Sequence, residues 1–226
     1  MQDIVEKLNE ELNCETLFSI AGIRITESVA ATWIIIAAVL LISLVLTRNL
    51  RVEDPGKGQL ALEGAVKWLY DFFDSTMGHE GAEYYFYLMT VIVFIGIANL
   101  MGIIGFKPPT KDLNVTIALS VMSIVLIQVA NIRKRGPKGW LKSFAEPMPI
   151  VAPINVLELF IKPLSLCMRL FGNVLGSFVI MELIEIVVPV IVPMIFSLYF
   201  DIFDGLIQAY VFAFLTALFM KEAMEA

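Results

Sequence analysis

Three long stretches without a charged residue limit what this chain can fold into more than any other feature. They cover residues 28–47, 84–106 and 113–132. Each is long enough to cross the hydrocarbon core of a bilayer as a helix, which takes ~20 residues. Charged residues make up only 17% of the chain, against roughly a quarter in an ordinary soluble domain. The sequence therefore predicts an integral membrane protein.

Two further apolar stretches follow a basic connector. They cover residues 154–188 and 194–220, on either side of a turn marked by Pro189 and Pro193. We therefore expect an all-α integral membrane protein that forms a single membrane domain over residues 1–226, with five membrane-embedded helices.

An amphipathic helix is predicted at residues 57–77, between the first two spans. Its apolar residues recur at helical spacing, and its charged residues lie elsewhere on the helical wheel. Either the cytoplasmic membrane surface or a partner can cover such an apolar face, and both interpretations stay open.

Lysine and arginine are distributed unevenly between the two sides of this arrangement. Ten lie in the connectors 48–83 and 133–149 and in the C-terminal tail, and four lie on the opposite side. The positive-inside rule therefore places the N-terminal segment 1–25 outside and the C-terminus in the cytoplasm. The first fifteen residues are acidic rather than basic, so we expect no cleaved signal peptide.

The composition excludes several classes of function. The net charge is −6 and the sequence holds no basic patch with interleaved aromatic residues, so nucleic acid is not an expected partner. Cys14 and Cys167 are far apart and lack the spacing of metal ligands. His79 is the only histidine, which leaves no histidine-based metal site or catalytic triad. We expect no bound cofactor or metal.

The fourth apolar stretch is longer than an upright span requires. From Ile154 to Val188 it can run for 35 residues, about 52 Å of helix, whereas an upright span needs about 30 Å. Strong tilt, a kink at Pro163 or protrusion can take up the excess. A steeply inclined helix could lay one face along a partner for most of its length.

Polar and small residues surround one arginine in this stretch. Arg169 lies among leucines, and helical spacing places six other residues near its side of the helix. These are Glu158, Lys162, Ser165, Gly172, Asn173 and Gly176. Glu182 and Glu185 fall on a different face, nearer the outer side of the membrane.

The last apolar stretch carries a polar stripe of its own. It is formed by Asp201, Asp204, Gly205 and Gln208, with the aspartates nearer the outer end. If the last two helices run antiparallel, Gln208 comes close to the level of Arg169.

An arginine at this depth points to ion transport. It costs between about 3 and well over 10 kcal/mol at the centre of a bilayer, so such residues mark ion pathways or counter-ions. Arginine also keeps its proton, unlike lysine. We infer a permanent positive charge that attracts a carboxylate of another chain and blocks direct passage of cations. Carboxylates on both sides would then line two separate half-paths, with Glu158 inward and Glu182, Glu185, Asp201 and Asp204 outward.

Structural explanations of these residues remain open. Arg169 could bond to backbone carbonyls or to Asp204, and Lys162 could snorkel to the cytoplasmic interface. Glu182 and Glu185 could simply lie at the outer interface. The two glycines at four-residue spacing also suit plain helix packing, and Asn99 suits a hydrogen bond between helices.

The motifs around these residues resemble one known family. KPLSLCMRLFGN, followed later by LIQAYVFAFLTALF, looks like the a subunit of F-type ATP synthases, as does PTKDLN with NVTIALS. The resemblance runs from about residue 57 to the C-terminus. RLFGN and QAYVF are its specific parts.

The resemblance implies a stator subunit of the Fo sector in a bacterial plasma membrane. Two offset half-channels would couple flow of H⁺ or Na⁺ to rotation of the c-subunit ring and to ATP synthesis, with Arg169 facing the rotor carboxylate. Asn173 and Gln208 match the polar positions that accompany this arginine. The implied partners are the c ring, the subunit b peripheral stalk, the rest of the F1Fo complex and membrane lipid. The subunit by itself would not be an enzyme.

Two departures from the family pattern affect the outer inlet. Many bacterial relatives carry a glutamate where this chain has Phe178, and a histidine or glutamate where it has Asp201. Glu182, Glu185, Asp201 and Asp204 are therefore our candidates for the inlet. The coupling ion stays open between H⁺ and Na⁺.

Two other classes of function remain as alternatives. A secondary transporter with its own substrate site predicts repeated halves and interrupted helices, and we find no internal repeat. A structural membrane scaffold would tolerate loss of the charge at Arg169. Purification together with a ring of small two-helix proteolipids would favour the stator subunit.

Overall fold

The fold is a helical membrane assembly preceded by a short hairpin. The computed structural model describes residues 16–20, 23–48, 50–51, 55–104, 108–144, 149–187, 196 and 198–225. Its elements are β1 (Thr16–Ile20), β2 (Ile23–Thr26), α2 (Glu27–Thr47), α3 (Lys57–Met77), η1 (His79–Tyr84), α4 (Tyr85–Leu100), η2 (Met101–Ile104), η3 (Pro109–Lys111), α5 (Leu113–Ser143), η4 (Pro149–Val151), α6 (Ala152–Val187), η5 (Leu198–Asp204) and α8 (Gly205–Glu225).

The predicted helical membrane fold is confirmed. Five stretches of the described residues are helical, long and apolar enough to cross a membrane. They contain α2, α4, α5 and α8 and residues 152–181 of α6. The antiparallel pair β1–β2 is an addition that the sequence analysis did not predict.

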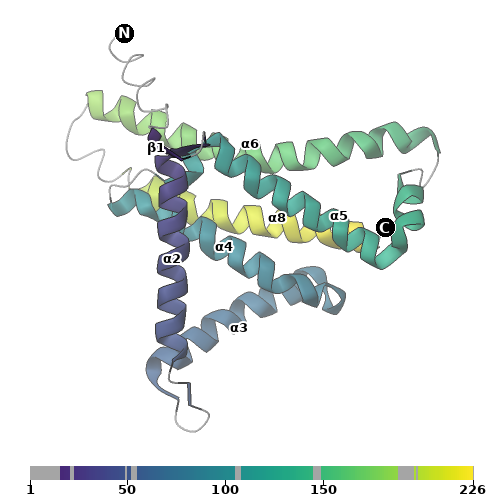
Figure 1. Ribbon diagram of the computed structural model, residues 1–226, viewed down its shortest axis with the longest axis horizontal. Coiled ribbons are helices and arrows are strands. Elements are labelled where there is room, and N and C mark those ends of the chain that lie inside the picture. Colours follow the sequence, from purple (N-terminus) through teal and green to yellow (C-terminus); the bar gives the residue numbers. More distant parts are fainter. Residues whose placement is uncertain are drawn as a thin grey trace.

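The helices do not form an upright bundle. In Figure 1, α6 and α8 run across the direction of α2, and α5 lies alongside α6. Helices that cross at such a wide angle cannot all follow the membrane normal. This arrangement agrees with the strong tilt expected for the last two membrane helices. α6 passes through Pro163 as one helix of 36 residues, so a break there does not take up its length.

α5 extends beyond the span expected at residues 113–132. Asp112 caps its start by accepting a hydrogen bond from the backbone N–H of Asn114 at 2.9 Å. Near its other end the helical backbone is interrupted at Gly136, whose φ of 72° glycine tolerates, and a second helical segment continues from this kink to Ser143. The bend carries a basic segment away from the membrane part of α5.

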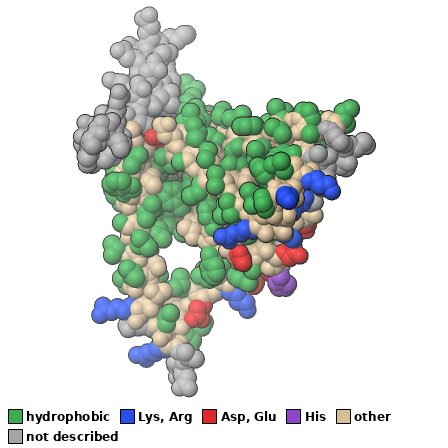
Figure 2. Space-filling model, turned by 45° about the vertical axis from the view of Figure 1, so that its right-hand side comes forward, with side chains coloured by type: hydrophobic (Ala, Val, Ile, Leu, Met, Phe, Trp, Pro, Cys, Tyr) green, Lys and Arg blue, Asp and Glu red, His purple; other side chains and the backbone are tan. Residues whose placement is uncertain are grey.

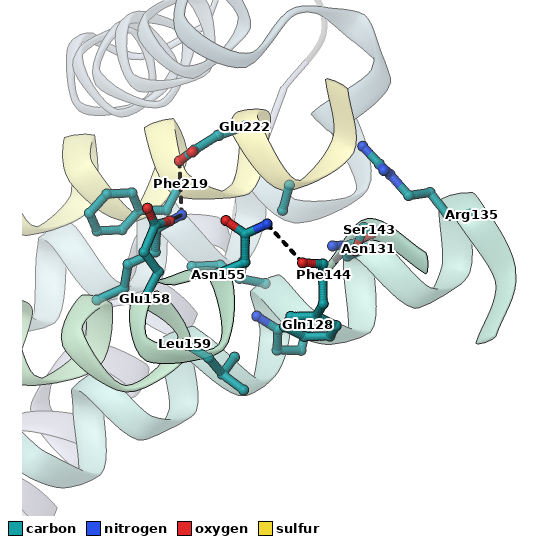
Figure 3. Close-up of a pocket in the computed structure, with 13 residues that line it drawn as sticks. Gln128, Asn131, Arg135, Ser143, Phe144, Asn155, Glu158, Leu159, Phe219 and Glu222 are labelled. Atoms are coloured by element: carbon teal, nitrogen blue, oxygen red, sulfur yellow. Dashed lines mark hydrogen bonds and ion pairs between the residues drawn. The ribbon is translucent and has the colours of Figure 1, made fainter. Parts of the chain in front are cut away.

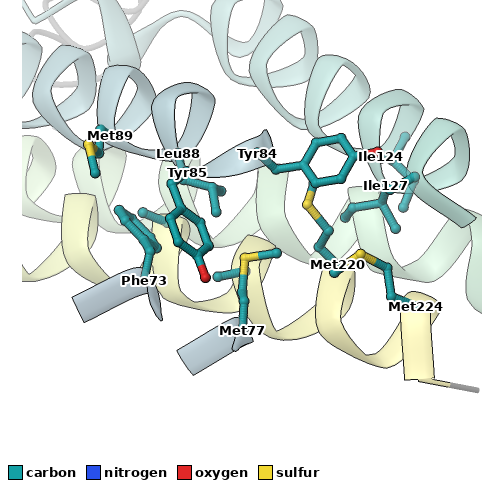
Figure 4. Packing of buried hydrophobic residues seen from close by; sticks show 13 residues of the cluster. Phe73, Met77, Tyr84, Tyr85, Leu88, Met89, Ile124, Ile127, Met220 and Met224 are labelled. Carbon is teal, nitrogen blue, oxygen red and sulfur yellow. The ribbon is translucent and has the colours of Figure 1, made fainter. Parts of the chain in front are cut away.

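The main core lies where α3 and α8 meet α4 and α5. Figure 4 shows Phe73 and Met77 of α3 beside Tyr85 of α4, with Met220 of α8 between α4 and α5. The Tyr85 hydroxyl also lies 2.6 Å from the carbonyl oxygen of Gly78, just after α3 ends. The amphipathic helix α3 therefore buries part of its apolar face within its own chain, while Leu60, Val66 and Trp68 remain exposed.

The exposed surface matches a membrane environment. Hydrophobic side chains cover most of the face in Figure 2, and most of its charged side chains gather along one margin. Ile35 is the only buried residue within the described range of α2, so that helix presents nearly its whole apolar surface outward. On the charged margin, η1 and α5 are joined by the ion pairs Glu80–Lys134 and Glu83–Arg133.

Candidate functional site

The orientation of α6 about its own axis places Arg169 on the exposed side of the helix. Leu166 and Leu170 are buried and belong to a cluster with residues of α4, α5 and α8. Cys167 is also buried, 3.5 Å from the Thr116 hydroxyl of α5. Packing of this face fixes the helix, and Arg169 lies on the exposed side. No residue within the described ranges forms a hydrogen bond or ion pair with its guanidinium.

The polar stripe around Arg169 lies largely on the same exposed side. Ser165 and Gly172 are exposed on either side of the arginine, and Asn173 follows one turn away. Gly172 has no atom within 4 Å of the position that a Cβ would take. The glycine therefore leaves open space next to Arg169, where another helix could approach.

Asn173 connects this face to α8. Its side-chain amide donates a hydrogen bond to Gln208 Oε1 at 2.5 Å. Gln208 is buried, and its own Nε2 has no hydrogen-bond partner among the described residues. Because Gln208 bonds to Asn173, which lies one turn after Arg169, α6 and α8 bring Gln208 and Arg169 to similar levels, as expected. An unpaired buried amide is costly, so this group is suited to bonding water or an approaching polar side chain.

The start of α8 is held against α4 by a buried polar contact. Asn99 Nδ2 donates to the Gly205 carbonyl at 3.0 Å, and Asn99 Oδ1 accepts from the Thr110 hydroxyl at 2.7 Å. The hydrogen bond between helices predicted for Asn99 is therefore confirmed.

Only part of the predicted outer inlet can be described. Asp204 is half-buried at the end of η5, a π-helical segment that leads into α8. No hydrogen bond or ion pair joins it to Arg169 within the described part of the chain. The side chains of Phe178, Glu182, Glu185 and Asp201 lie outside the described residues. Asp204 thus stands as the one candidate of this group whose surroundings are known.

A cavity lined by charged, amide and apolar side chains opens at the cytoplasmic end predicted for α5, α6 and α8. Its volume is about 520 Å³. Figure 3 shows Glu158 of α6 and Glu222 of α8 on one side, with Gln128 and Arg135 of α5 on the other. Asn155 donates a hydrogen bond to the Phe144 carbonyl at 3.0 Å within it. The walls therefore offer carboxylates, amides and cations to water.

Lys162 lies between two carboxylates in this cavity. Its Nζ is 3.3 Å from Glu158 Oε2 and 3.0 Å from Glu222 Oε2. The ammonium also lies 5.3 Å from the centre of the Phe219 ring. Lys162 is therefore held by ion pairs from two helices rather than only extending toward the interface. Such partly exposed pairs each contribute about 0.2–1 kcal/mol.

Glu222 was missed by reasoning from the sequence. It follows the last apolar stretch, and the sequence does not distinguish it from the other charged residues of the tail, which are expected to be solvated. The antiparallel register of α6 and α8 could have predicted the contact. Lys162 lies eleven residues before Asn173, and Phe219 lies eleven residues after Gln208. Glu222, one turn after Phe219, therefore comes near the level of Lys162.

The remaining chemistry of the described chain is sparse. Groups of three or more metal-binding side chains are absent from the described residues. His79 lies with Asp74 on the charged margin, their Nδ1 and Oδ1 3.0 Å apart. The arrangement as a whole can hold ions and water at polar sites on α6 and α8.

Comparison with known proteins identifies a single family. The family model for the ATP synthase A chain matches residues 29–221. ATP synthase subunit a of Moorella thermoacetica is 36% identical over 173 residues, which are 76% of this chain and 79% of that protein. The subunit a of Legionella pneumophila is 30% identical over 210 residues, 92% of this chain and 91% of its own length. A subunit a of Hahella chejuensis is 30% identical over 219 residues, 96% and 92% of the two chains.

Proposed function

The chain belongs to the ATP synthase A chain family, and on this premise we propose that Arg169 is the fixed cation that faces the carboxylates of a rotating ring. Membership of the family makes the chain an ion-translocating, non-catalytic subunit of the membrane sector of ATP synthase. The proposal adds which residues perform that task.

The exposure of Arg169, together with the lack of a partner for it among the described residues, carries the proposal. A buried face of α6 turns this guanidinium outward among apolar side chains, and no described residue of its own chain neutralises it. An arginine at membrane depth is too costly to stand alone, so the assembled complex must supply water or an opposing carboxylate. The c ring supplies that carboxylate in our proposal.

The electrostatic task follows from the permanence of the charge. A carboxylate that reaches Arg169 stays ionised because the guanidinium stabilises its anionic form. The ion bound to that carboxylate must therefore leave before the two groups meet. A cation cannot slip past the arginine in the other direction, because the same charge repels it. The ring is thus obliged to turn for ions to cross.

Two half-paths flank Arg169 in this proposal. The cavity that contains Glu158 and Lys162 forms the cytoplasmic half-path, with Ser165 between it and the arginine. Asp204 contributes to the outer half-path, together with Asp201, Glu182 and Glu185. Asn173 and Gln208 hold polar groups near Arg169, where an arriving carboxylate would need hydrogen-bond donors.

The proposed setting is a bacterial plasma membrane with the N-terminus outside. The charged margin formed by η1 and the end of α5 would then face the cytoplasm. Subunit b and the soluble sector would complete the complex. The transported ion is H⁺ or Na⁺, and ATP-driven transport measured with and without Na⁺ at fixed pH distinguishes the two.

Replacing the arginine tests the proposal. In Arg169→Gln, the complex should assemble while ATP synthesis driven by an ion gradient falls to background, because the ring carboxylate loses its counter-charge. Arg133→Gln is the matched control, since Arg133 is an exposed arginine paired with Glu83 at 3.7 Å. ATP synthesis by Arg169→Gln at the rate of the control, with equal amounts of complex, would refute the role of Arg169.

A further inference from the structure

The end of α8 reaches back to α6 through one side chain. Glu222 lies three residues before the last helical residue and contacts Lys162, 60 residues away in sequence, at 3.0 Å. Glu158 holds the same ammonium from the preceding turn of α6 at 3.3 Å. The side chain of Lys162 is only 24% exposed, so its charge is fixed in place between the two helices.

This cluster lines the open cavity, and it shares α6 with Arg169. Lys162 precedes Arg169 by seven residues on a continuous helix, about 10 Å along its axis. The charged groups that line the cavity are Arg135, Glu158, Lys162 and Glu222, contributed by α5, α6 and α8. A cation that enters the cavity from the cytoplasm therefore meets the ammonium and its two carboxylates before it can reach the arginine.

We propose that Lys162 and Glu222 form an electrostatic gate at the cytoplasmic mouth of the ion path, with Glu222 as a further residue that sets ion access. This inference rests on the proposed function, in which the cavity is the cytoplasmic half-path. Glu222 makes the local potential more negative and raises the local concentration of cations. Lys162 opposes it, and the ion pair keeps the ammonium at the mouth rather than in the solvent.

The two residues therefore have opposite effects on the same quantity. Neutralising Glu222 leaves Lys162 less compensated and lowers the concentration of cations at the mouth. Neutralising Lys162 leaves two carboxylates without their shared counter-ion and raises it. When a charge within a few ångströms of the transported ion is removed in a partly solvated path, the half-saturating ion concentration changes by about three- to tenfold.

ATP-driven pumping by inverted membrane vesicles that contain the complete ATP synthase tests the gate. The cytoplasmic side faces the medium in these vesicles, so the concentration of the transported ion at the mouth can be set directly. Glu222→Gln should raise the half-saturating ion concentration about three- to tenfold, and Lys162→Gln should lower it by a similar factor. General damage to the subunit would lower the maximal rate and would not move the two variants in opposite directions.

Glu225→Gln is the matched control. Glu225 lies on the same last turn of α8, pairs with Lys221 at 3.9 Å, and does not line the cavity. Its half-saturating concentration should equal that of the wild type. If Glu222→Gln reduces assembly, Lys162→Gln and Lys162→Glu provide the test, because the second must lower the value further than the first.

A shift of equal sign in Glu222→Gln and Lys162→Gln would overturn the gate, as would a Glu222→Gln variant indistinguishable from Glu225→Gln. An unchanged value in both Lys162 variants would overturn it too. Arg169 is intact in every variant, so such a result leaves its proposed role standing. Normal ATP synthesis by Arg169→Gln would instead refute the proposed function.

Discussion

Arg169 and Lys162 are two cations on one helix with opposite surroundings. Lys162 lies between two carboxylates in the cavity of α5, α6 and α8, whereas Arg169 has no charged or hydrogen-bonded partner among the described residues. The two ion pairs hold the Lys162 ammonium in place between α6 and α8. Arginine without a partner stays charged and available to another chain, which suits the central position in the proposed path.

Asp204 is the outer carboxylate whose surroundings are best defined. It lies half-buried where the π-helical segment η5 meets α8, directly before Gly205 and four residues before Gln208 in the same polar stripe. We expect the double variant Asp201→Asn and Asp204→Asn to lower ion-driven ATP synthesis several-fold, because amides cannot take up and release a cation as carboxylates do. The measurement is synthesis by reconstituted complexes at a fixed gradient.

A carboxylate elsewhere on the same side serves as the control for this pair. Glu27 begins α2 and lies outside the polar stripe of α8, so Glu27→Gln should synthesise ATP at the wild-type rate. Unchanged synthesis in the double aspartate variant would remove both residues from the path.

At the scale of elements, the contact between α4 and α8 sets where the polar stripe of α8 lies. A Cβ placed on Gly205 would come within 2.9 Å of Asn99 Cβ, closer than two side chains can pack. Glycine at this position therefore allows the start of α8 to approach α4 and keeps the Asn99 hydrogen bond short. Gln208 follows one turn later on α8, so the contact at Gly205 also determines where Gln208 lies.

Gly205→Ala tests this role of the contact. The extra methyl group should force α4 and α8 apart and destabilise the subunit by about 1–3 kcal/mol, measured as a lower midpoint of thermal unfolding in detergent. Gly64→Ala is the control, because no atom lies within 4 Å of its Cβ position on the exposed side of α3. Alanine favours helix there, so that midpoint should stay equal or rise. A Gly205→Ala midpoint as high as that of Gly64→Ala would contradict the account of the contact.

Most helices could be predicted from the sequence because membrane segments are marked by missing charges. α2 and α3 match their expected ranges closely, one from an uncharged run and the other from helical periodicity. The helical segment after Gly136 was not predicted. The Gly136–Pro137 pair interrupts the helical backbone, as such a pair usually does, but a second helical segment follows it to Ser143. The π-helical turn η5 leaves no trace in hydropathy, so the start of α8 at Gly205 could not be placed.

Some residues of the candidate site could be predicted from the sequence, and one could not. Arg169 stands out because a permanent charge in an apolar run has few explanations. The expected antiparallel register placed Gln208 near the level of Arg169, and the structure joins Gln208 by a hydrogen bond to Asn173, one turn after the arginine. The contact of Glu222 with Lys162 depends on how far α8 extends past its last apolar residues, which composition does not reveal.

At the scale of the whole molecule, one arrangement accounts for the wide crossing angles and the exposed apolar surface. α6 and α8 lie across α2 (Figure 1), which indicates strong tilt of α6 in the membrane. A tilted helix can contact a partner along most of its exposed face rather than at one short crossing. Large apolar side chains such as Leu157, Leu164 and Met168 are exposed along it. Only a partner helix or lipid can cover such a face, and Arg169 in its middle favours a partner that brings carboxylates.

A density map of the complete complex tests this central claim most directly. The account predicts a helix of the rotor opposite α6, with its carboxylate turned toward the guanidinium of Arg169 and with the cavity around Lys162 open to the cytoplasm. A map in which Arg169 is directed into lipid, or is bonded to carbonyl or carboxylate groups of its own chain with no other helix facing it, would contradict the account.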